Sequence, residues 1–287
     1  MIQQRDLSII SNTLLRERGG RRIPDQTIEL DYALGWFLAE LARHPFNEKL
    51  AFKGGTALRR CHIGEYRFSE DLDFTLLSED GIDAIRLAFE EISAAVEAQT
   101  GMPFSFARPD PQPHENSHTF YMAFTGPMRR AREFKVDITK TEAIVDALKN
   151  KPILITYDTF DFPKDRAVKV YSLNEIVAEK ILAITDPKRS QPRDLYDLWF
   201  LHSEERVEFS LLADAVAQKL KFRGRSGEGL AAAFDKKERP LQATWKTRLD
   251  PQMTETPEFE SVFRETRRAF RQSNIFDLAL EAQNRLG

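Results

Sequence analysis

The sequence predicts an α+β fold: a mixed sheet flanked by helices, followed by a helical C-terminal domain. In the first half of the chain, segments with strand-like alternation are interspersed with segments of helical spacing. From about Pro163 onward, the apolar residues recur mainly at helical spacing. The chain has 287 residues, 41% hydrophobic and 30% charged, as expected of a folded globular protein. We therefore expect two domains, at residues 1–165 and 166–287.

The expected elements alternate between helix and strand in the first domain and are helices in the second. Proline and glycine mark the ends of elements: Pro24 lies near the start of the first helix, and residues 109–113 and 126–127 indicate turns. The first domain should contain helices over 23–41 and 82–96, a helix that starts over 57–61, a short apolar run at 50–52, and strands over 68–76, 104–107, 119–124 and 133–139. The second should contain helices over 173–184, 194–202 and 210–220, and a helical tail from 257 to 286.

The composition excludes several classes of protein. No apolar run approaches the roughly 18 residues of a membrane span, and the N-terminus has no secretory apolar region, so we expect no membrane partner. The single cysteine, Cys61, cannot form an internal disulfide, which favours the cytoplasm. The net charge of −3 does not indicate nucleic-acid binding, although three basic clusters could follow a phosphate backbone or simply be solvated faces. These clusters are Arg16–Arg22, Arg129–Arg132 and Lys219–Arg225.

Two aspartates, Asp71 and Asp73, alternate with large apolar residues. Side chains at positions i and i+2 of a strand share a face, so Leu72 and Phe74 should enter the core and both carboxylates should lie opposite. Their Cα atoms would be about 7 Å apart. Carboxylates held so close repel unless a cation lies between them, and oxygen ligands suit Mg²⁺ (or Mn²⁺). The pair is therefore a candidate metal site.

A third acid, Asp137, lies in a segment that alternates in the same way, with Phe134, Val136 and Ile138 inward. If its strand lies beside that of Asp71 and Asp73, the three carboxylates form a platform. Such a platform can hold two metal ions about 3.5–4 Å apart, one near the attacking oxygen and one near the leaving group.

A glycine loop, Lys53-Gly54-Gly55-Thr56, precedes the aspartates. Glycines allow backbone N–H groups to approach and cradle a phosphate, and the helix that follows points its positive end toward it. Either motif alone has an ordinary explanation, because Gly-Gly is a common turn and alternating acids often line a solvated strand. The order of glycine loop, helix, residues 67–70 and then Asp-x-Asp on a strand is far more specific.

That order, with a later strand aspartate, resembles the DNA polymerase β-like nucleotidyltransferase superfamily. Residues 52–58 (FKGGTAL) and 67–74 (RFSEDLDF) are similar to the AbiEii/MenT family of bacterial toxins, and residues 175–180 and 193–198 resemble that family's distal motifs. The resemblance covers about residues 50–202, although the gap from Gly-Gly to Asp71 is a little longer than in most of the superfamily. It implies a nucleotidyltransferase-type sheet, Mg²⁺ or Mn²⁺ as cofactor and an NTP as substrate.

Lys180 and Asp194 belong to the distal motifs. Lys180 falls on the apolar stripe of its expected helix, where a lysine either snorkels to water or faces a cleft to meet an anion. Asp194 follows Pro192 in the first turn of a helix, where an aspartate is commonly a cap. For Asp197, one turn further along the helix, we expect a structural role. The resemblance implies that Lys180 binds the triphosphate and that Asp194 is an essential acid that orients Lys180 or Arg193.

The resemblance thus gives a set of expected site residues. Asp137 could also deprotonate the acceptor hydroxyl, and Ser69, which has no obvious base, should position phosphate or Asp71. Asp71, Asp73 and Asp137 are the expected metal ligands, and they form the expected catalytic group with Lys180 and Asp194. The expected nucleotide-binding residues are Lys53, Gly54, Gly55, Thr56, Ser69, Lys180 and Arg193.

The expected reaction is transfer of a nucleoside monophosphate from an NTP to an acceptor. The resemblance implies the toxin of a toxin–antitoxin or phage-defence system, with the tRNA 3′ end as leading acceptor and a cognate antitoxin as a further partner. A protein or small-molecule acceptor is one alternative, because acceptor choice depends on surface loops. A catalytically silent member that only binds a nucleotide or a partner is another, against which the intact acids argue.

Overall fold

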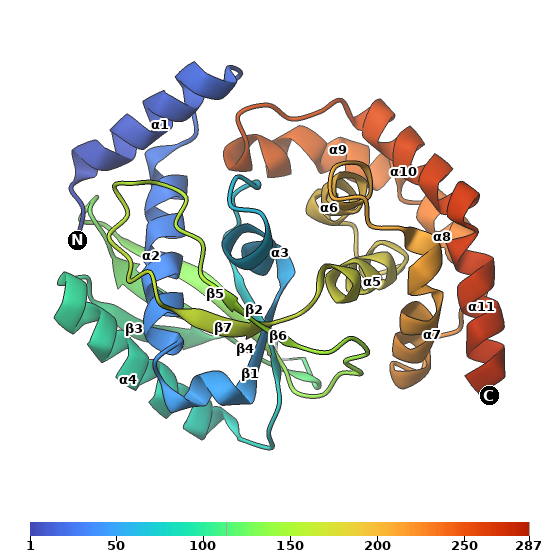
Figure 1. Cartoon of the computed structure of the whole chain (residues 1–287), viewed down its shortest axis with the longest axis horizontal. Helices are drawn as coiled ribbons and strands as arrows, with labels where there is room; N and C mark the ends of the chain where they lie inside the picture. Colours follow the sequence, from blue (N-terminus) through green and yellow to red (C-terminus); the bar gives the residue numbers. More distant parts are fainter. Residues whose placement is uncertain (113, 287) are drawn as a thin grey trace. The chain divides into compact units, whose positions relative to one another are not determined.

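A mixed sheet organises the first part of the chain (Figure 1). The computed structural model describes residues 1–112 and 114–286, so Pro113 of the predicted turn and Gly287 of the predicted C-terminal domain lie outside the described residues. Within the described residues the sheet has seven strands in the order β3-β4-β5-β2-β1-β7-β6. The strands are β1 Leu50–Lys53, β2 Leu72–Leu76, β3 Phe104–Pro109, β4 Ser117–Thr125, β5 Ala131–Thr139, β6 Lys149–Pro152 and β7 Ala167–Val170.

Two parallel pairings lie among antiparallel ones. β2 pairs with β5 in parallel, and β1 pairs with β7 in parallel, whereas β1 with β2 and β4 with β5 are antiparallel. The β2–β5 pairing places two strands from distant parts of the sequence side by side. These two strands carry the aspartates singled out in the sequence.

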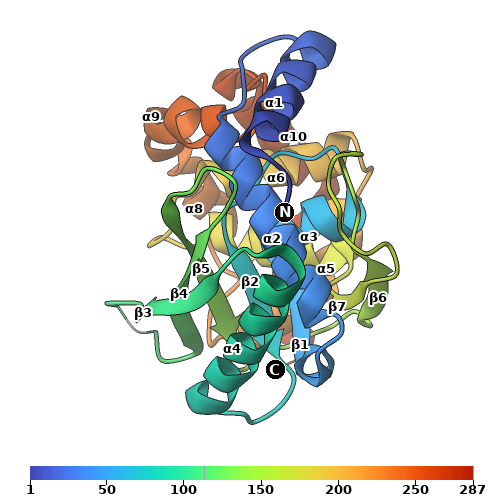
Figure 2. The same cartoon turned by 90° about the vertical axis from the view of Figure 1, so that its left-hand side faces the viewer.

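One face of the sheet is covered by α2 (Asp25–Leu41) and α4 (Ile82–Thr100), as Figures 1 and 2 show. Aromatic rings fill the space between helices and strands, because large apolar side chains bury the most area for each residue ordered. Ring centroids lie 5.1 Å apart for Phe37 and Phe89, and 6.2 Å apart for Phe37 and Phe134. This packing turns the apolar side chains of β5 toward the helices and leaves Asp137 on the opposite face.

The α+β prediction is confirmed, and most predicted elements are present within a few residues. Two differ in a way that matters for the site. The predicted strand over 68–76 is shorter, because β2 begins only at Leu72 and Asp71 precedes it. The helix after the glycine loop is α3 (Gly54–Ala57), which continues as a π-helical turn over Leu58–His62.

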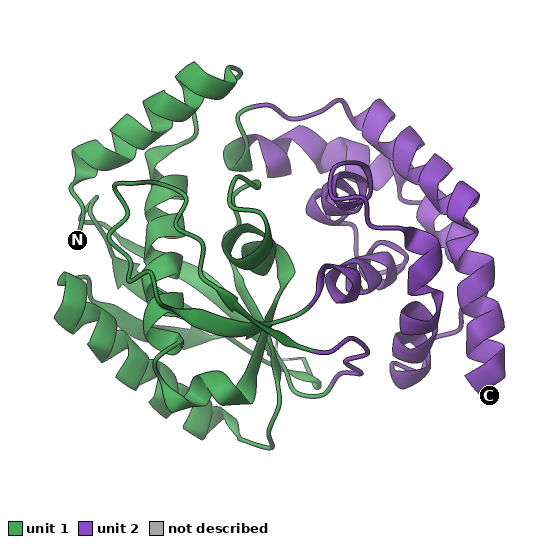
Figure 3. Cartoon of the chain, in the orientation of Figure 1, with its two compact units in different colours: residues 1–141, 148–171, 251–254 green, residues 142–147, 172–250, 255–287 purple. Residues whose placement is uncertain are grey.

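The chain divides into two compact units (Figure 3). The first contains Met1–Thr141, Leu148–Tyr171 and Pro251–Thr254, and the second contains Glu142–Ala147, Ser172–Asp250 and residues 255–286. The predicted domains meet at residues 165 and 166, whereas the chain passes into the helices of the second unit at Ser172. The first unit also contains α1 (Gln4–Arg18) and the 3₁₀ turn Pro45–Lys49.

The second unit is helical. Ser172 caps α5 by accepting a hydrogen bond from Glu175 N at 3.0 Å, and Pro192 stands in the first turn of α6, where a proline costs no hydrogen bond. No helix among the described residues is long and apolar enough to cross a membrane. The helices are α5 Leu173–Ile184, α6 Pro192–Ser203, α7 Ala213–Phe222, α8 Leu230–Asp235, α9 Glu238–Leu249, α10 Phe259–Ser273 and α11 Ile275–Leu286, with 3₁₀ turns at Phe209–Leu212 and Asp250–Gln252.

Candidate active site

Three charged residues lie in one row across the sheet. In the strand register, Lys53 of β1 is opposite Asp73 of β2, and Asp73 is beside Asp137 of β5. Residues directly across from one another share a face of the sheet. The predicted neighbourhood of Asp73 and Asp137 is therefore present, on the face that α2 and α4 leave open. Both carboxylates are partly exposed.

The glycine loop packs directly against Asp73. Gly54 has φ +78°, in the left-handed region that favours glycine, and a Cβ atom built on it would lie 2.2 Å from Asp73 Oδ2. No side chain fits there. The carboxylate therefore lies against the backbone of the loop, which explains why the Gly-Gly and Asp-x-Asp motifs occur together.

The second glycine contacts the segment that precedes β2. A Cβ atom on Gly55 would lie 2.9 Å from Ser69 Oγ and 3.0 Å from an Arg67 guanidinium nitrogen. Thr56 Oγ1 donates a hydrogen bond to Asp71 O at 2.5 Å. The loop is thus fastened at Ser69, Asp71 and Asp73, so six of the predicted site residues form one structure: Gly54, Gly55, Thr56, Ser69, Asp71 and Asp73.

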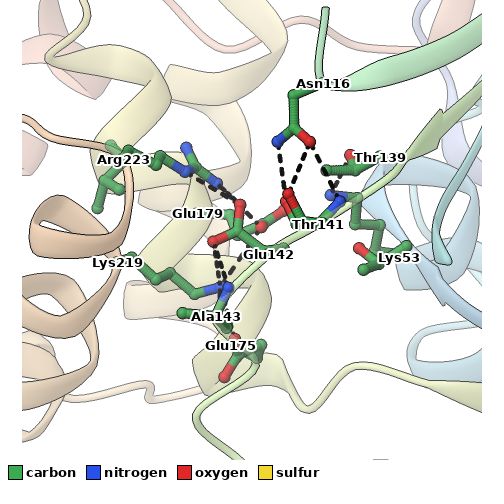
Figure 4. Close-up of polar contacts among 12 residues, drawn as sticks. Lys53, Asn116, Thr139, Thr141, Glu142, Ala143, Glu175, Glu179, Lys219 and Arg223 are labelled. Atoms are coloured by element: carbon green, nitrogen blue, oxygen red, sulfur yellow. Dashed lines mark hydrogen bonds and ion pairs between the residues drawn. The ribbon is translucent and has the colours of Figure 1, made fainter. Parts of the chain in front are cut away.

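Lys53 is a buried lysine next to this structure. Its ammonium donates a hydrogen bond to Thr139 Oγ1 at 3.0 Å (Figure 4) and lies 5.6 Å from the centroid of the Tyr171 ring. The Tyr171 hydroxyl is 2.7 Å from Thr75 Oγ1. Since β2 lies between β1 and β5, the Lys53 side chain spans β2 to reach Thr139.

Asp137 has a cationic neighbour on its own strand. Lys135 Nζ lies 3.7 Å from Asp137 Oδ2 and 3.8 Å from Asp110 Oδ2. About a third of each side chain in the Lys135–Asp137 pair is exposed. The Asp137 carboxylate therefore lies beside the Lys135 ammonium group, and both side chains are partly exposed.

The donor set suits a hard divalent ion that is completed by a substrate. Within the described residues, no three His, Cys, Asp or Glu side chains form a group that could hold a metal ion by themselves. Mg²⁺ commonly takes only one or two carboxylates from the protein and completes its shell with water and phosphate oxygens. Asp73 and Asp137, in register, and Asp71, just before β2, offer oxygen ligands only, and the three-carboxylate platform stays a prediction.

A buried ion-pair network joins the turn that follows the glycine loop to α2. Arg59, in the π-helical turn after the loop, donates to both carboxylate oxygens of Asp31 in α2 at 2.9 and 3.0 Å, and its guanidinium stacks on Phe68 at 3.9 Å. Arg60 binds Asp31 Oδ1 at 2.9 Å. Burial alone would raise the pKa of Asp31, but the two guanidinium groups outweigh it and hold that pKa below its usual value.

Sequence reasoning missed this network. The signal was present, because Asp31 interrupts an apolar helix and Arg59 and Arg60 interrupt an apolar run. Charged residues are almost never fully buried unless they are paired. The sequence therefore predicts that these charged residues are paired, but it does not predict which residues are the partners.

In the second unit, Lys180 lies between two buried aspartates. Its ammonium is 3.1 Å from Asp194 Oδ1 and 2.5 Å from Asp197 Oδ2. Arg189 donates to Asp194 Oδ2 at 2.8 Å. Burial would raise the pKa of Asp194, but Lys180 and Arg189 hold it below its usual value. Lys180 is therefore neither snorkelled nor at the surface, and it forms ion pairs with Asp194 and Asp197. Arg193 is partly exposed.

Within the basic cluster Lys219–Arg225, Lys219 does not lie at the surface, so it cannot grip RNA. Lys219 is fully buried, with its ammonium 2.6 Å from Glu175 Oε1 and 2.7 Å from Ala143 O (Figure 4). Arg223 binds Glu142 at 2.5 Å and Glu179 at 3.1 Å. Lys219 and Arg223 hold the segment Glu142–Ala147 to α5 and α7 within the second unit, so their charges are already paired with carboxylates.

The other two basic clusters are partly paired. Arg18 lies 3.0 Å from Glu65, Arg22 lies 2.6 Å from Asp25, and Arg132 lies 3.7 Å from Glu29. Arg129 and Arg130 are exposed in the turn between β4 and β5. By strand rise, that turn lies about 20 Å from Asp137 along β5.

The chain is similar to known proteins in both sequence and fold. Residues 36–273 match the family model described as nucleotidyl transferase AbiEii toxin, type IV toxin–antitoxin system. No curated protein sequence matches the chain. Seven chains of solved structures match, among them MenT4, a nucleotidyltransferase toxin from Mycobacterium tuberculosis H37Rv. The match to MenT4 has 18% identity and a TM-score of 0.64 and covers 100% of this chain and 98% of that one, which is a likeness of fold.

Proposed function

This chain belongs to the AbiEii nucleotidyltransferase toxin family of type IV toxin–antitoxin systems, and from that premise we propose that it transfers a nucleoside monophosphate from an NTP to a tRNA 3′ end, with Mg²⁺ or Mn²⁺ as cofactor. The observation that carries the proposal is the packing of Gly54 against Asp73, with Asp137 in register beside Asp73. It brings a candidate phosphate cradle and candidate metal ligands to one place.

The proposed reaction is an in-line displacement at the α-phosphorus. The oxygen of the acceptor 3′-hydroxyl forms the new P–O bond, the bond between the α-phosphorus and its bridging oxygen breaks, and pyrophosphate leaves. Asp137 takes the hydroxyl proton. A divalent ion held by Asp71, Asp73 and Asp137 would stabilise negative charge on the phosphate oxygens, which is the main catalytic task in phosphoryl transfer.

The triphosphate would bind at the glycine loop. Gly54 and Gly55 leave space for phosphate oxygens to approach backbone N–H groups, and Thr56 and Ser69 place hydroxyls beside them. The nucleotide-binding roles of Lys180 and Arg193, and the catalytic role of Asp194, stay predictions. The ion pairs of Lys180 with Asp194 and Asp197 support a further role for these residues in holding α5 to α6.

The decisive experiment supplies each α-³²P-labelled NTP with total tRNA and Mg²⁺. We expect label on RNA, its loss in EDTA, and its loss when the tRNA 3′-terminal diol has been oxidised with periodate. Asp73→Asn should reduce transfer at least 100-fold. Asp80→Asn is the matched control, because Asp80 follows the same strand but pairs with Lys49.

Other outcomes would point elsewhere. Label on a protein or on a small molecule would move the acceptor to one of the alternatives, and label that persists on oxidised tRNA would exclude the 3′ end. An intact, folded chain that transfers nothing from any NTP would contradict the proposal. A type IV system also implies a cognate antitoxin, which we propose as the protein partner of this chain.

A further inference from the structure

Lys53 places a positive charge where burial makes charge costly. The residue is only 8% exposed, and a buried lysine is rare unless its charge is compensated. Two of its contacts are to neutral groups, the Thr139 hydroxyl and the face of the Tyr171 ring. A hydroxyl and an aromatic face offset only part of a full charge. The compensation must therefore be sought among the acids of the same face.

The carboxylates in register supply it. Lys53 is directly opposite Asp73, and directly opposed residues of antiparallel strands have Cβ atoms about 4.5–5.5 Å apart on one face. Asp73 also leans onto Gly54, the residue next to Lys53. Asp137 is the next member of the row, and Thr139, which accepts the hydrogen bond from Lys53, lies two residues beyond it on the same face.

The path of the side chain takes the ammonium across the acids. It starts on β1, crosses β2 and ends at β5, the three strands that carry the row. Asp73 and Asp137, in register on neighbouring strands, would repel one another without a cation between them. Lys135 lies 3.7 Å from Asp137 and 3.8 Å from Asp110, so its charge is shared between two acids.

We propose that the Lys53 ammonium is a fixed cation of this carboxylate face, which holds Asp73 and Asp137 together before any metal binds. Lys53 then acts as a positioning residue for the metal ligands and not as a direct ligand of the triphosphate. The inference rests on the proposed function, because it concerns the same site.

The test measures thermal unfolding in EDTA. Lys53→Met keeps most of the aliphatic side chain and removes its charge, and we expect the Tm to fall by about 5–10 °C, since the repulsion between Asp73 and Asp137 then loses a buried cation. Adding Asp73→Asn to that variant should recover at least half of the loss. Mn²⁺ should also raise the Tm of Lys53→Met more than that of the unchanged chain.

Two matched variants separate charge from hydrogen bonding and from a general effect of losing a lysine. Thr139→Val removes only the hydrogen bond and should lower the Tm by less than half as much as Lys53→Met. Lys49→Met removes a half-exposed lysine paired with Asp80 and should change the Tm by about 1 °C or less. Equal losses in Thr139→Val and Lys53→Met, or no recovery with Asp73→Asn, would overturn the proposal.

Absence of tRNA labelling would refute the proposed acceptor instead, because the Tm does not depend on transfer.

Discussion

At Gly54 the backbone of the glycine loop packs directly against a candidate metal ligand, the Asp73 carboxylate. Its φ of +78° disfavours any side chain, and the space a Cβ atom would need is occupied by the Asp73 carboxylate. Gly54→Ala should therefore displace Asp73, reduce nucleotidyl transfer at least 100-fold, and lower stability by about 1–3 kcal/mol. Steady-state transfer and urea unfolding measure the two effects.

Gly81→Ala is the control for that substitution. Gly81 has a φ of −79°, and a Cβ atom there would meet nothing within 4 Å. Its transfer rate and stability should match those of the unchanged chain. If Gly54→Ala were equally silent, the close packing of the loop against Asp73 would have no part in the reaction.

Cys61 illustrates how burial decides reactivity at a single residue. The thiol lies in the π-helical turn, and burial raises its pKa to about 12, with small opposing effects from Lys151 and Arg60. Because the thiolate is the reactive form, the folded chain should react with a thiol reagent such as DTNB at least 100-fold more slowly than the chain in guanidinium chloride. A fast reaction of the folded chain would show that the turn opens readily.

Among the elements, α2 and the π-helical turn are joined by charge. Asp31→Asn would leave Arg59 and Arg60 buried with one carboxylate fewer, and breaking a buried ion pair from one side costs about 3–5 kcal/mol. We expect a loss of that size in urea unfolding. Asp25→Asn, which weakens the more exposed pair with Arg22 and leaves Ser8 an amide oxygen to bind, should cost under about 1 kcal/mol. Equal losses would mean that the network carries no special share of stability.

The pairing of α5 with α6 allows the predicted role of Lys180 to be tested. If Lys180 binds the triphosphate, Lys180→Met should raise the KM for NTP at least tenfold in a chain that still folds. Lys188→Met is the control, because Lys188 is exposed in the loop between the two helices. An unchanged KM in Lys180→Met would leave Lys180 with only its ion pairs to Asp194 and Asp197.

The elements that could be predicted are those in which the burial of one face produces the periodicity of the sequence. Alternation in residues 133–138 reports which side chains face the core, so the outward position of Asp137 followed directly. β6 and β7 were missed because each has only four residues, too few to show alternation, and Lys149–Pro152 is also largely polar. Their pairing is set by the neighbouring strand and not by their own pattern.

Partners across the sequence were the part that could not be predicted. Asp31 with Arg59, and Lys219 with Glu175, are joined only by the tertiary fold. Lys219 looked like one of several surface cations because its neighbours in sequence are charged. In α7 it faces the buried side of the helix, where the carboxylates of Glu175 and Glu142 compensate it.

At the scale of the whole molecule, buried ionisable groups set how stability changes with pH. His62 donates from Nε2 to Tyr171 O at 2.9 Å and accepts at Nδ1 from Lys151 Nζ at 3.0 Å, an arrangement that requires the neutral ring. Burial, with the nearby charge of Lys151, lowers the pKa of His62 to about 4. The pKa values of Asp31 and Asp194 are also held low, in their case by cations.

These directions give two separate losses as the pH falls. The unfolded chain protonates His62 near pH 6.5, whereas the folded chain does so only near pH 4, so stability falls between these values with a slope approaching 1.4 kcal/mol per pH unit, about 2–3 kcal/mol in all. The carboxyls contribute stability that is fully present above their unfolded pKa near 4 and is lost only below it. Urea unfolding from pH 7.5 to 3.5 should therefore show a decline well before the carboxyls titrate.

The histidine step can be isolated with one substitution. His62→Gln keeps an amide that can donate to Tyr171 O, and it cannot take up a proton in this range. Its stability should decline less from pH 6.5 to 4.5 than that of the unchanged chain, and the remaining decline belongs to His118, whose pKa burial also lowers. His114→Gln is the control, because His114 is exposed and its loss should leave the decline in place. A decline of equal size in His62→Gln would assign the proton to another group. A clearly smaller decline would show that the neutral imidazole beside Tyr171, the last residue of the first unit before α5, accounts for most of the stability lost in this pH range.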